Sequence, residues 1–180
     1  PNEDPIKVIK KMNQTDNFKF DEANVMNELV YRNLSEDAKR QICAWKYGGE
    51  YDLYNLPAYE EMQVRQIGFM NPQREKNYYG FWDESILVGF VNILEEKEEV
   101  FIGIGVNPDL CNKHYGQRML LITYEISKKL YPNKPLYLEV RTWNIRAVKC
   151  YQKAGFRIDG QAYELTTGIG TGTFYRMIRE

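Results

Sequence analysis

The change of hydrophobic period between Asn77 and Leu130 constrains the fold of this chain more than any other feature. Apolar and polar residues alternate over 77–82, 86–94 and 100–106, with short polar turns between them, which is typical of an antiparallel meander. Residues 115–130 then carry apolar side chains at helical spacing, which predicts a helix with one face against the sheet. A crossover helix after a meander predicts a mixed sheet with helices on both faces, an α/β fold.

The segments that follow extend this pattern to the end of the chain. Residues 136–140 form a short apolar strand, and residues 145–153 are expected to form a helix that Gly155 stops. Residues 156–166 and 173–178 are the last two expected strands, on either side of a glycine-rich turn.

The N-terminal part of the chain is expected to contain one strand followed by helices. Residues 6–12 alternate as a strand, and Asp21 can cap a helix that runs to about residue 34. Ser35 can cap a second helix to about residue 46, and Pro57 suits the start of a short helix to about residue 67. The predicted order is β-α-α-β-β-β-α-β-α-β-β. Without repeats or a long linker, we expect residues 1–180 to form one domain.

Composition argues against several classes of function. A formal net charge of -1 provides no basic field for nucleic acid. No apolar run approaches the roughly 20 residues that a membrane-spanning helix needs. Three cysteines without a Cys-x-x-Cys pair and a single histidine indicate neither a disulfide framework nor a zinc site. We therefore expect a cytoplasmic monomer or homodimer with no metal and no nucleic-acid or membrane partner.

The junction between the third meander strand and the long helix is expected to bind an anion. Its sequence, VNPDLCNKHYGQR at residues 106–118, is a strand end, a turn and a helix start. Backbone N–H groups and the positive end of a helix dipole meet at such a junction. Asn112, Lys113 and Arg118 could add side-chain donors, and Gly116 would let a phosphate approach the backbone. An ordinary strand-to-helix turn explains the same residues equally well.

A second stretch, LEVRTWNIRAVKCYQKAGF at residues 138–156, follows at the next strand and helix. Together the two stretches resemble the GNAT superfamily of N-acetyltransferases, whose members look like V-x-P-x-x-[RQ]-x-x-G-x-[GA], then a strand, then N-x-x-A-x-x-x-Y-x-x-x-G-F. The match spans about residues 80–160, and its LEVR-x-x-N segment is similar to the bacterial ribosomal-protein N-terminal-alanine acetyltransferases. The resemblance implies a GNAT fold and acetyl transfer from acetyl-coenzyme A to an amine by direct attack in a ternary complex.

The resemblance also implies which residues handle the two protons of this reaction. Tyr151 matches the general acid for the coenzyme A sulfur, because a phenol is protonated at neutral pH; core packing is the competing interpretation. Glu139 matches the base of the alanine-acetyltransferase pattern, and a surface glutamate is the alternative there. Glu98 or Glu99, and a water relayed by a backbone carbonyl, are the other candidates for the base.

By the same resemblance, the coenzyme lies along the third meander strand and the turn after it. The strand is expected to pair with the pantetheine arm, and Gly103 and Gly105 either permit a bulge that opens its edge or mark close packing. Asn144 caps its helix or hydrogen-bonds the arm. The predicted coenzyme-binding residues are Ile104, Gly105, Val106, Cys111, Asn112, Lys113, His114, Tyr115, Gly116, Gln117, Asn144 and Tyr151.

Two residues depart from the family pattern. Cys111 stands where the motif has Arg or Gln, and His114 stands where it usually has its first glycine. Because backbone N–H groups hold the pyrophosphate, neither change removes the cradle, although the imidazole could crowd it. We do not favour His114 as a base or Cys111 as a nucleophile, since neither has an apparent partner in the sequence.

The segment between the first two strands is expected to wall the acceptor site. We predict that Tyr51, Tyr54 and Glu50 contact the acceptor. The same segment carries further tyrosines and acids: Tyr47, Tyr59, Asp52, Glu60 and Glu61. Rings and carboxylates attract a cationic amine, which suggests a small polyamine, an aminoglycoside or a peptide amine. Tyrosines packed under a loop with a solvated acidic rim are the alternative interpretation.

Two other functions are compatible with the sequence. One is a non-catalytic acyl-coenzyme A sensor or interaction module with the same fold. The other is a nucleotide-binding α/β protein. Release of coenzyme A on addition of an amine distinguishes an enzyme from a sensor, and ligand-dependent thermal stabilisation distinguishes acetyl-coenzyme A from ATP or NAD.

Overall fold

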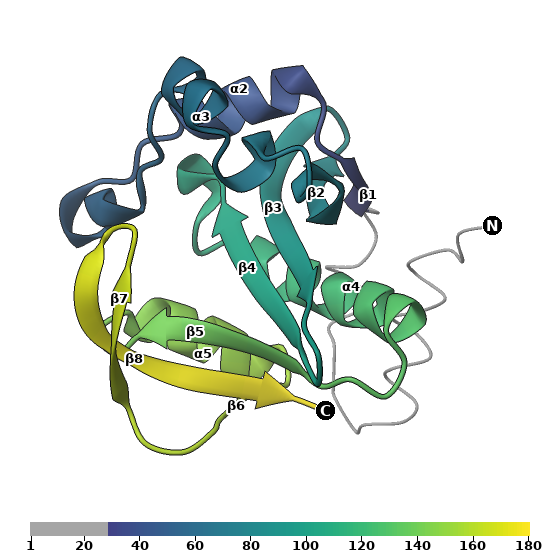
Figure 1. Ribbon diagram of the computed structural model, residues 1–180, viewed down its shortest axis with the longest axis vertical. Coiled ribbons are helices and arrows are strands. Elements are labelled where there is room, and N and C mark those ends of the chain that lie inside the picture. The colour runs from purple at the N-terminus through teal and green to yellow at the C-terminus, as the bar shows by residue number, and fades with distance from the viewer. Residues whose placement is uncertain (1–28) are drawn as a thin grey trace.

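The computed structural model describes residues 29–180, which are built on one eight-stranded mixed sheet (Figure 1). The strands are β1 (Leu29–Asn33), β2 (Tyr78–Asp83), β3 (Ile86–Glu95), β4 (Val100–Val106), β5 (Leu136–Arg141), β6 (Arg157–Ile158), β7 (Tyr163–Thr167) and β8 (Gly170–Arg179). The α-helices are α2 (Glu36–Ala44), α3 (Tyr59–Arg65), α4 (Tyr115–Leu130) and α5 (Ile145–Lys153), and a 3₁₀ turn covers Gly49–Tyr54.

The strand order is β1-β2-β3-β4-β5-β8-β6, with β7 also paired to β8. Strands β4 and β5 are parallel, and every other pair is antiparallel. The predicted meander is confirmed as β2, β3 and β4, and helices α4 and α5 have the predicted bounds. The mixed α/β sheet predicted from the crossover helix is therefore confirmed.

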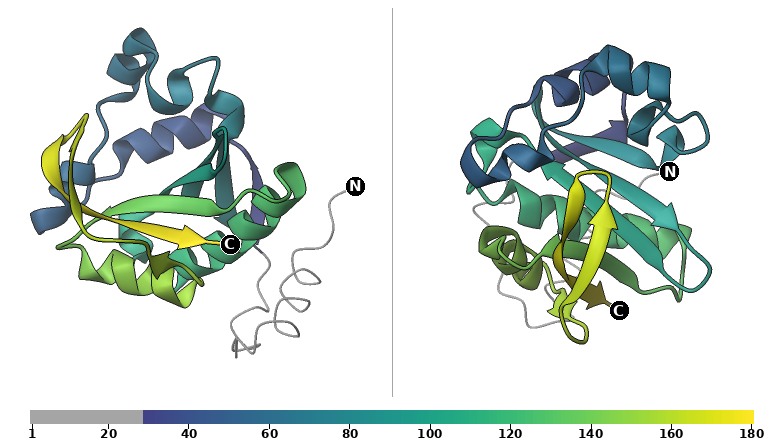
Figure 2. Two further views of the ribbon diagram at one scale, coloured as in Figure 1. Left: turned by 60° about the horizontal axis from the view of Figure 1, so that its bottom comes forward. Right: turned by 60° about the vertical axis from the view of Figure 1, so that its left-hand side comes forward.

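Two hydrophobic clusters pack the helices against the sheet. In the larger cluster, Met119 and Leu120 of α4 and Val148 of α5 pack against strand residues such as Ile102 and Leu138. In the smaller cluster, α2 and α3 pack against residues of β2 and β3. Helices therefore cover both faces, as predicted (Figure 2). Within residues 29–180, no helix has the length and apolar character that crossing a bilayer requires.

The start of the described chain differs from the prediction. Residues 29–33 were expected to end a helix, but they form the edge strand β1, in which Leu29 pairs with Asp83 and Asn33 with Tyr79. Leu29 is buried, whereas Val30 is half exposed, so burial follows a period of two. The aromatic and β-branched residues of LVYRN favour a strand, and pairing with β2 decides the outcome. The strand predicted for residues 6–12 lies outside the described residues.

The connections on either side of this region follow the prediction more closely. Ser35 caps α2 by accepting a hydrogen bond from the Ala38 N–H at 3.2 Å, and α3 begins two residues after Pro57. Near the C-terminus, residues 156–166 were expected to form one strand. They form β6 and the start of β7 instead, with a turn at Gly160, whose φ of 76° only glycine adopts readily.

Strands β4 and β5 part soon after they meet. They pair only at Val100 with Leu136 and at Phe101 with Tyr137, and Figure 1 shows the two strands diverging from that point. The β7–β8 hairpin and the 49–54 turn lie at the open end of the resulting gap (Figures 1 and 2). This gap positions the candidate site.

Candidate active site

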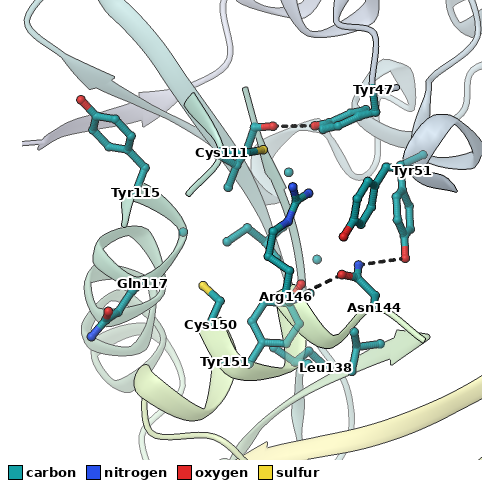
Figure 3. A pocket seen from close by; sticks show the side chains of 18 of the residues that line it. Tyr47, Tyr51, Cys111, Tyr115, Gln117, Leu138, Asn144, Arg146, Cys150 and Tyr151 are labelled. Atoms are coloured by element: carbon teal, nitrogen blue, oxygen red, sulfur yellow. Dashed lines mark hydrogen bonds between the residues drawn. The ribbon is translucent and has the colours of Figure 1, made fainter. Parts of the chain in front are cut away.

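The gap between β4 and β5 contains a cavity of about 610 Å³ (Figure 3). Its walls come from β4, the turn before α4, the start of α4, one face of α5, β5 and the 49–54 turn. Among the described residues that line it, Glu139 is the only carboxylate, whereas four basic side chains belong to Arg141, Arg146, Lys149 and Lys153. The cavity therefore suits a ligand that carries negative charge.

The backbone of β4 presents hydrogen-bonding groups to this cavity. The N–H of Val100 donates to the carbonyl of Pro135 on the β5 side at 2.9 Å, whereas the N–H of Asn107 donates to Val88 of β3 at 2.9 Å. Backbone direction alternates along a strand, so Ile104 and Val106 point their groups away from β3, as Val100 does. Because β5 has diverged by then, the groups of Ile104 face the gap and can pair with an extended ligand.

The turn before α4 aims further N–H groups at the same region. Asn112 and His114 have φ values of 65° and 64°, a left-handed conformation that is uncommon outside glycine and that reorients the backbone amides. The N–H of Arg118 makes the first helical bond, to the His114 carbonyl at 3.2 Å. The N–H groups of Tyr115, Gly116 and Gln117 precede that bond and have no helical acceptor, so the helix start can hold an anion.

Two side chains at the start of α4 fix the position of the helix. The Tyr115 hydroxyl donates to Asp83 at 2.6 Å, and the Gln117 amide donates to the Lys153 carbonyl at 3.3 Å. A Cβ atom on Gly116 would lie 3.0 Å from the Sγ of Cys150. Glycine at 116 therefore allows α4 and α5 to approach closely.

Three basic residues follow one face of α5. Arg146, Lys149 and Lys153 all line the cavity, and their spacing of three and four residues places them on one side of a helix. The Arg146 guanidinium lies 4.1 Å from the centre of the Tyr51 ring, and Figure 3 shows it crossing the cavity. These cations can neutralise a phosphorylated ligand.

Tyr151 points its ring into the cavity from the last turn of α5 (Figure 3). Desolvation raises the pKa of Tyr151 well above its ordinary value, neighbouring Cys150 and Tyr54 raise it further, and the charge of Arg146 opposes the shift. The phenol therefore remains a proton donor across the neutral range. No hydrogen bond of its hydroxyl to residues 29–180 occurs, so the proton is available to a ligand.

Glu139 lines the cavity from β5. One of its carboxylate oxygens accepts a hydrogen bond from the Tyr163 hydroxyl of β7 at 2.7 Å. Desolvation and this hydrogen bond raise the pKa of Tyr163, so Tyr163 stays protonated and orients the carboxylate. The second oxygen accepts no hydrogen bond from the described residues and can take a proton from a ligand.

Tyrosines of the segment between α2 and α3 close the open side of the cavity. Tyr51 and Tyr54 pack on Trp143 with ring centres 5.6 Å and 6.1 Å away. Asn144 accepts the Ala147 N–H at 3.2 Å and also donates to the Tyr54 hydroxyl at 3.2 Å. Asn144 thus caps α5 and holds the tyrosine wall at once (Figure 3).

Tyr47 attaches the tyrosine wall to the end of β4. The Tyr47 hydroxyl donates to the Val106 carbonyl at 2.6 Å, and desolvation raises the pKa of Tyr47, which keeps the donor protonated. Because Tyr47→Phe removes this hydrogen bond, the variant is expected to lower the free energy of unfolding by about 1 kcal/mol. Urea unfolding measures the loss. Tyr124→Phe is the matched control, since the Tyr124 hydroxyl donates to the exposed Glu180 carbonyl at 2.9 Å. An equal loss of stability in the two variants would contradict a special role for the Tyr47 hydrogen bond.

The sequence pattern of this site matches a known family. The model of the Acetyltransferase (GNAT) family aligns with residues 39–156, which is more than half of the chain. The chain belongs to the GNAT acetyltransferase family. The matched range includes β4, the turn before α4, β5 and α5, which form most of the cavity wall.

Solved GNAT structures share the fold. A GNAT acetyltransferase from Bacillus anthracis is 18% identical with a TM-score of 0.67, over 84% of this chain and 93% of that chain. Spermidine/spermine N-acetyltransferase SpeG from Vibrio cholerae is 19% identical with a TM-score of 0.64, over 86% and 94%. A GNAT acetyltransferase from Streptococcus pneumoniae is 23% identical with a TM-score of 0.61, over 84% and 98%. No curated protein sequence matches significantly.

In this GNAT chain, most of the predicted site residues lie together in the cavity. The lining includes Tyr51, Tyr54, Ile104, Gly105, Val106, Cys111, Asn112, His114, Tyr115, Gly116, Gln117, Glu139, Asn144 and Tyr151. Lys113 and Glu50 do not line it and are exposed. His114 is exposed and makes no cap bond with its side chain. The roles of all these residues stay predictions.

The alternative bases are not placed where a base is needed. Glu99 forms an ion pair with Arg176, and Glu98 is exposed beside Lys97; neither lines the cavity. The expected bulge in β4 is also absent, because its pairing with β3 runs without a register shift. A Cβ atom on Gly105 would lie 2.4 Å from the Phe90 ring, so this glycine marks close packing. Strand divergence opens the edge instead.

The acidic wall is a second correction. Glu60 and Glu61 form ion pairs with Arg40 and Arg65 at 3.6 Å and 2.9 Å, and Tyr59 is buried in the smaller cluster. Asp52 is exposed, and like Glu50 it does not line the cavity. The wall of the cavity is therefore aromatic, and the solvated acidic rim matches the alternative interpretation.

Arg141, Arg146, Lys149 and Lys153 were missed as site residues. The three on α5 share one helix face, a spacing that the sequence does display. Nothing in the sequence marks Arg141, because its position depends on how β5 leaves β4. No group of three or more His, Cys, Asp or Glu side chains that could hold a metal occurs within residues 29–180.

Proposed function

We propose that this GNAT protein is an acetyl-coenzyme A-dependent N-acetyltransferase that acts on an amine in a ternary complex. In this reaction an N–C bond forms, the C–S bond of the thioester breaks, one proton leaves the nitrogen and one reaches the sulfur. Tyr151 donates the proton to sulfur, and Glu139 accepts the proton from nitrogen. Acetyl-coenzyme A supplies the thioester.

The observation that carries this proposal is the diverging pair of strands next to a helix start. Backbone groups of Ile104 face the gap, three N–H groups at the start of α4 lack helical acceptors, and α5 adds three cations. An extended amide arm fits the strand edge, and a pyrophosphate fits the helix start. His114 lies at the rim of this cradle and its exposed imidazole can turn to solvent.

The acceptor is a primary amine that reaches Glu139 past the aromatic wall of Tyr51 and Tyr54. Similarity to spermidine N-acetyltransferases supports an amine acceptor, so polyamines, aminoglycosides and peptide amines form the test panel. The proposed acetyltransferase domain extends over residues 1–180, and we expect it to act without a metal.

Two measurements test this function. Acetyl-coenzyme A is expected to raise the melting temperature more than ATP or NAD does, because it alone fills both the strand edge and the helix start. Coenzyme A release, followed by a thiol reagent, is expected only when an amine is added. Stabilisation without release for any amine would indicate a sensor, and no stabilisation would contradict the proposed cradle.

A further inference from the structure

Arg141 is a buried cation without a carboxylate partner. It lines the cavity at the end of β5, and only 8% of it is exposed. Its Nε atom is buried and has no hydrogen-bond partner, and no ion pair of Arg141 occurs within residues 29–180. The only hydrogen bond from its guanidinium to residues 29–180 is a long one of 3.4 Å, from Nη2 to the Gly170 carbonyl. A desolvated charge is costly unless an anion pairs with it.

The β7–β8 hairpin holds this guanidinium in place. Its Cζ lies 5.0 Å from the centre of the Phe174 ring. A Cβ atom on Gly172 would lie 2.1 Å from its Nη1, so glycine at this position makes room for the side chain. The guanidinium is therefore positioned before any ligand arrives.

Alternation along β5 places Arg141 on the acceptor side of the sheet. Leu138 and Val140 belong to the core cluster with α4, so Glu139 and Arg141 both point to the opposite face. Arg141 thus faces away from the helix start that we assign to the pyrophosphate. Side chains two residues apart on a strand lie roughly 7 Å apart, which suits the two ends of a small zwitterion.

We propose that the acceptor is an amine that also carries a carboxylate, such as an amino acid or a short peptide, with the carboxylate bound by Arg141 and the amine beside Glu139. This inference rests on the proposed acetyltransferase function. It agrees with the position of Glu50 and Asp52 outside the cavity, where they cannot hold a polycation next to Glu139.

Matched acids and amides test this assignment. Coenzyme A release is measured with glycine and glycinamide, β-alanine and β-alaninamide, glycylglycine and its amide, and spermidine. Arg141→Met keeps an unbranched apolar stem and removes the guanidinium and its charge. It is expected to lower kcat/KM for the preferred acid by about 10- to 100-fold and to leave kcat/KM for the matching amide and the affinity for acetyl-coenzyme A unchanged.

A second variant moves the guanidinium without removing it. Gly172→Ala displaces Nη1 and should reduce the preference for the acid in the same direction. Thr173→Ala, on the exposed opposite face of β8, is the control and should leave the preference unchanged. A purely structural role for Arg141 would lower the rates for acid and amide equally, and that result would overturn the proposal, as would a wild-type preference for spermidine over every acid.

Failure of the acetyltransferase function is distinguishable from failure of this inference. If no amine releases coenzyme A, the function fails, and binding alone is then measured with N-acetylglycine and N-acetylglycinamide. Thermal stabilisation by the acid but not the amide, lost in Arg141→Met, would still support a carboxylate site. Equal stabilisation by both compounds, or by neither, would overturn it.

Discussion

Replacing Tyr151 with phenylalanine is expected to lower kcat by about 10²- to 10⁴-fold, the contribution that a positioned general acid makes. The variant keeps the ring that lines the cavity and loses only a hydroxyl that makes no hydrogen bond to the described residues, so the affinity for acetyl-coenzyme A should hardly change. Burial raises the pKa of Tyr151. The phenol therefore stays protonated below its ordinary pKa of about 10, and wild-type activity should not fall for this reason at neutral or mildly alkaline pH.

Steady-state kinetics of coenzyme A release and calorimetric titration with acetyl-coenzyme A measure the two quantities. Tyr79→Phe is the matched control, because burial also raises the pKa of Tyr79 and its ring does not line the cavity. A kcat for Tyr151→Phe equal to that of the control would exclude Tyr151 as the acid and favour core packing.

Glu139→Gln is expected to reduce kcat/KM at neutral pH by about 100-fold or more, because the glutamine cannot take a proton from the amine. The pH dependence has a definite sign. An alkyl ammonium has a pKa of about 10, so the fraction of neutral amine grows as pH rises toward that value. The deficit of the variant relative to wild type should therefore shrink from pH 7 to pH 9.

The rate profile of coenzyme A release against pH tests this expectation. Glu164→Gln is the control, since Glu164 follows Tyr163 on β7 and is exposed. A deficit that stays constant with pH would mean that Glu139 holds the amine and does not deprotonate it. Full activity in Glu139→Gln would assign the proton to a water relayed by a backbone carbonyl.

Sequence periodicity predicted the central fold because local pattern and burial agree there. Apolar residues alternate with polar ones in the meander strands and recur at helical spacing in α4, which places them against the core. The predicted bounds of α4 and α5 match the structure. Leu29–Asn33 was predicted wrongly because Leu29 and Val30 fit a helical stripe, whereas pairing with β2 is a contact across many residues of sequence. The single domain over 1–180 and the monomer or homodimer state stay predictions.

The sequence predicted the part of the site that backbone groups form at the end of β4 and the start of α4. The 106–118 and 138–156 stretches mark those junctions, and the structure brings Val106, Gly116 and Tyr151 to one cavity. Arg141 could not be found in this way, because its burial comes from the β7–β8 hairpin. Similarly, Glu60 and Glu61 could not be assigned to solvent or cavity until their partners Arg40 and Arg65 were placed.

The two residue pairs between β4 and β5 have a mechanical consequence. Few backbone hydrogen bonds join the β1–β4 part of the sheet to the β5–β8 part, so side-chain contacts provide most of the resistance to their separation. A ligand that binds between β4 and β5 adds contacts to both parts of the sheet and so holds them together. Native-state proteolysis should therefore cleave the unliganded protein near the β4–β5 junction, and bound acetyl-coenzyme A should protect this region from cleavage.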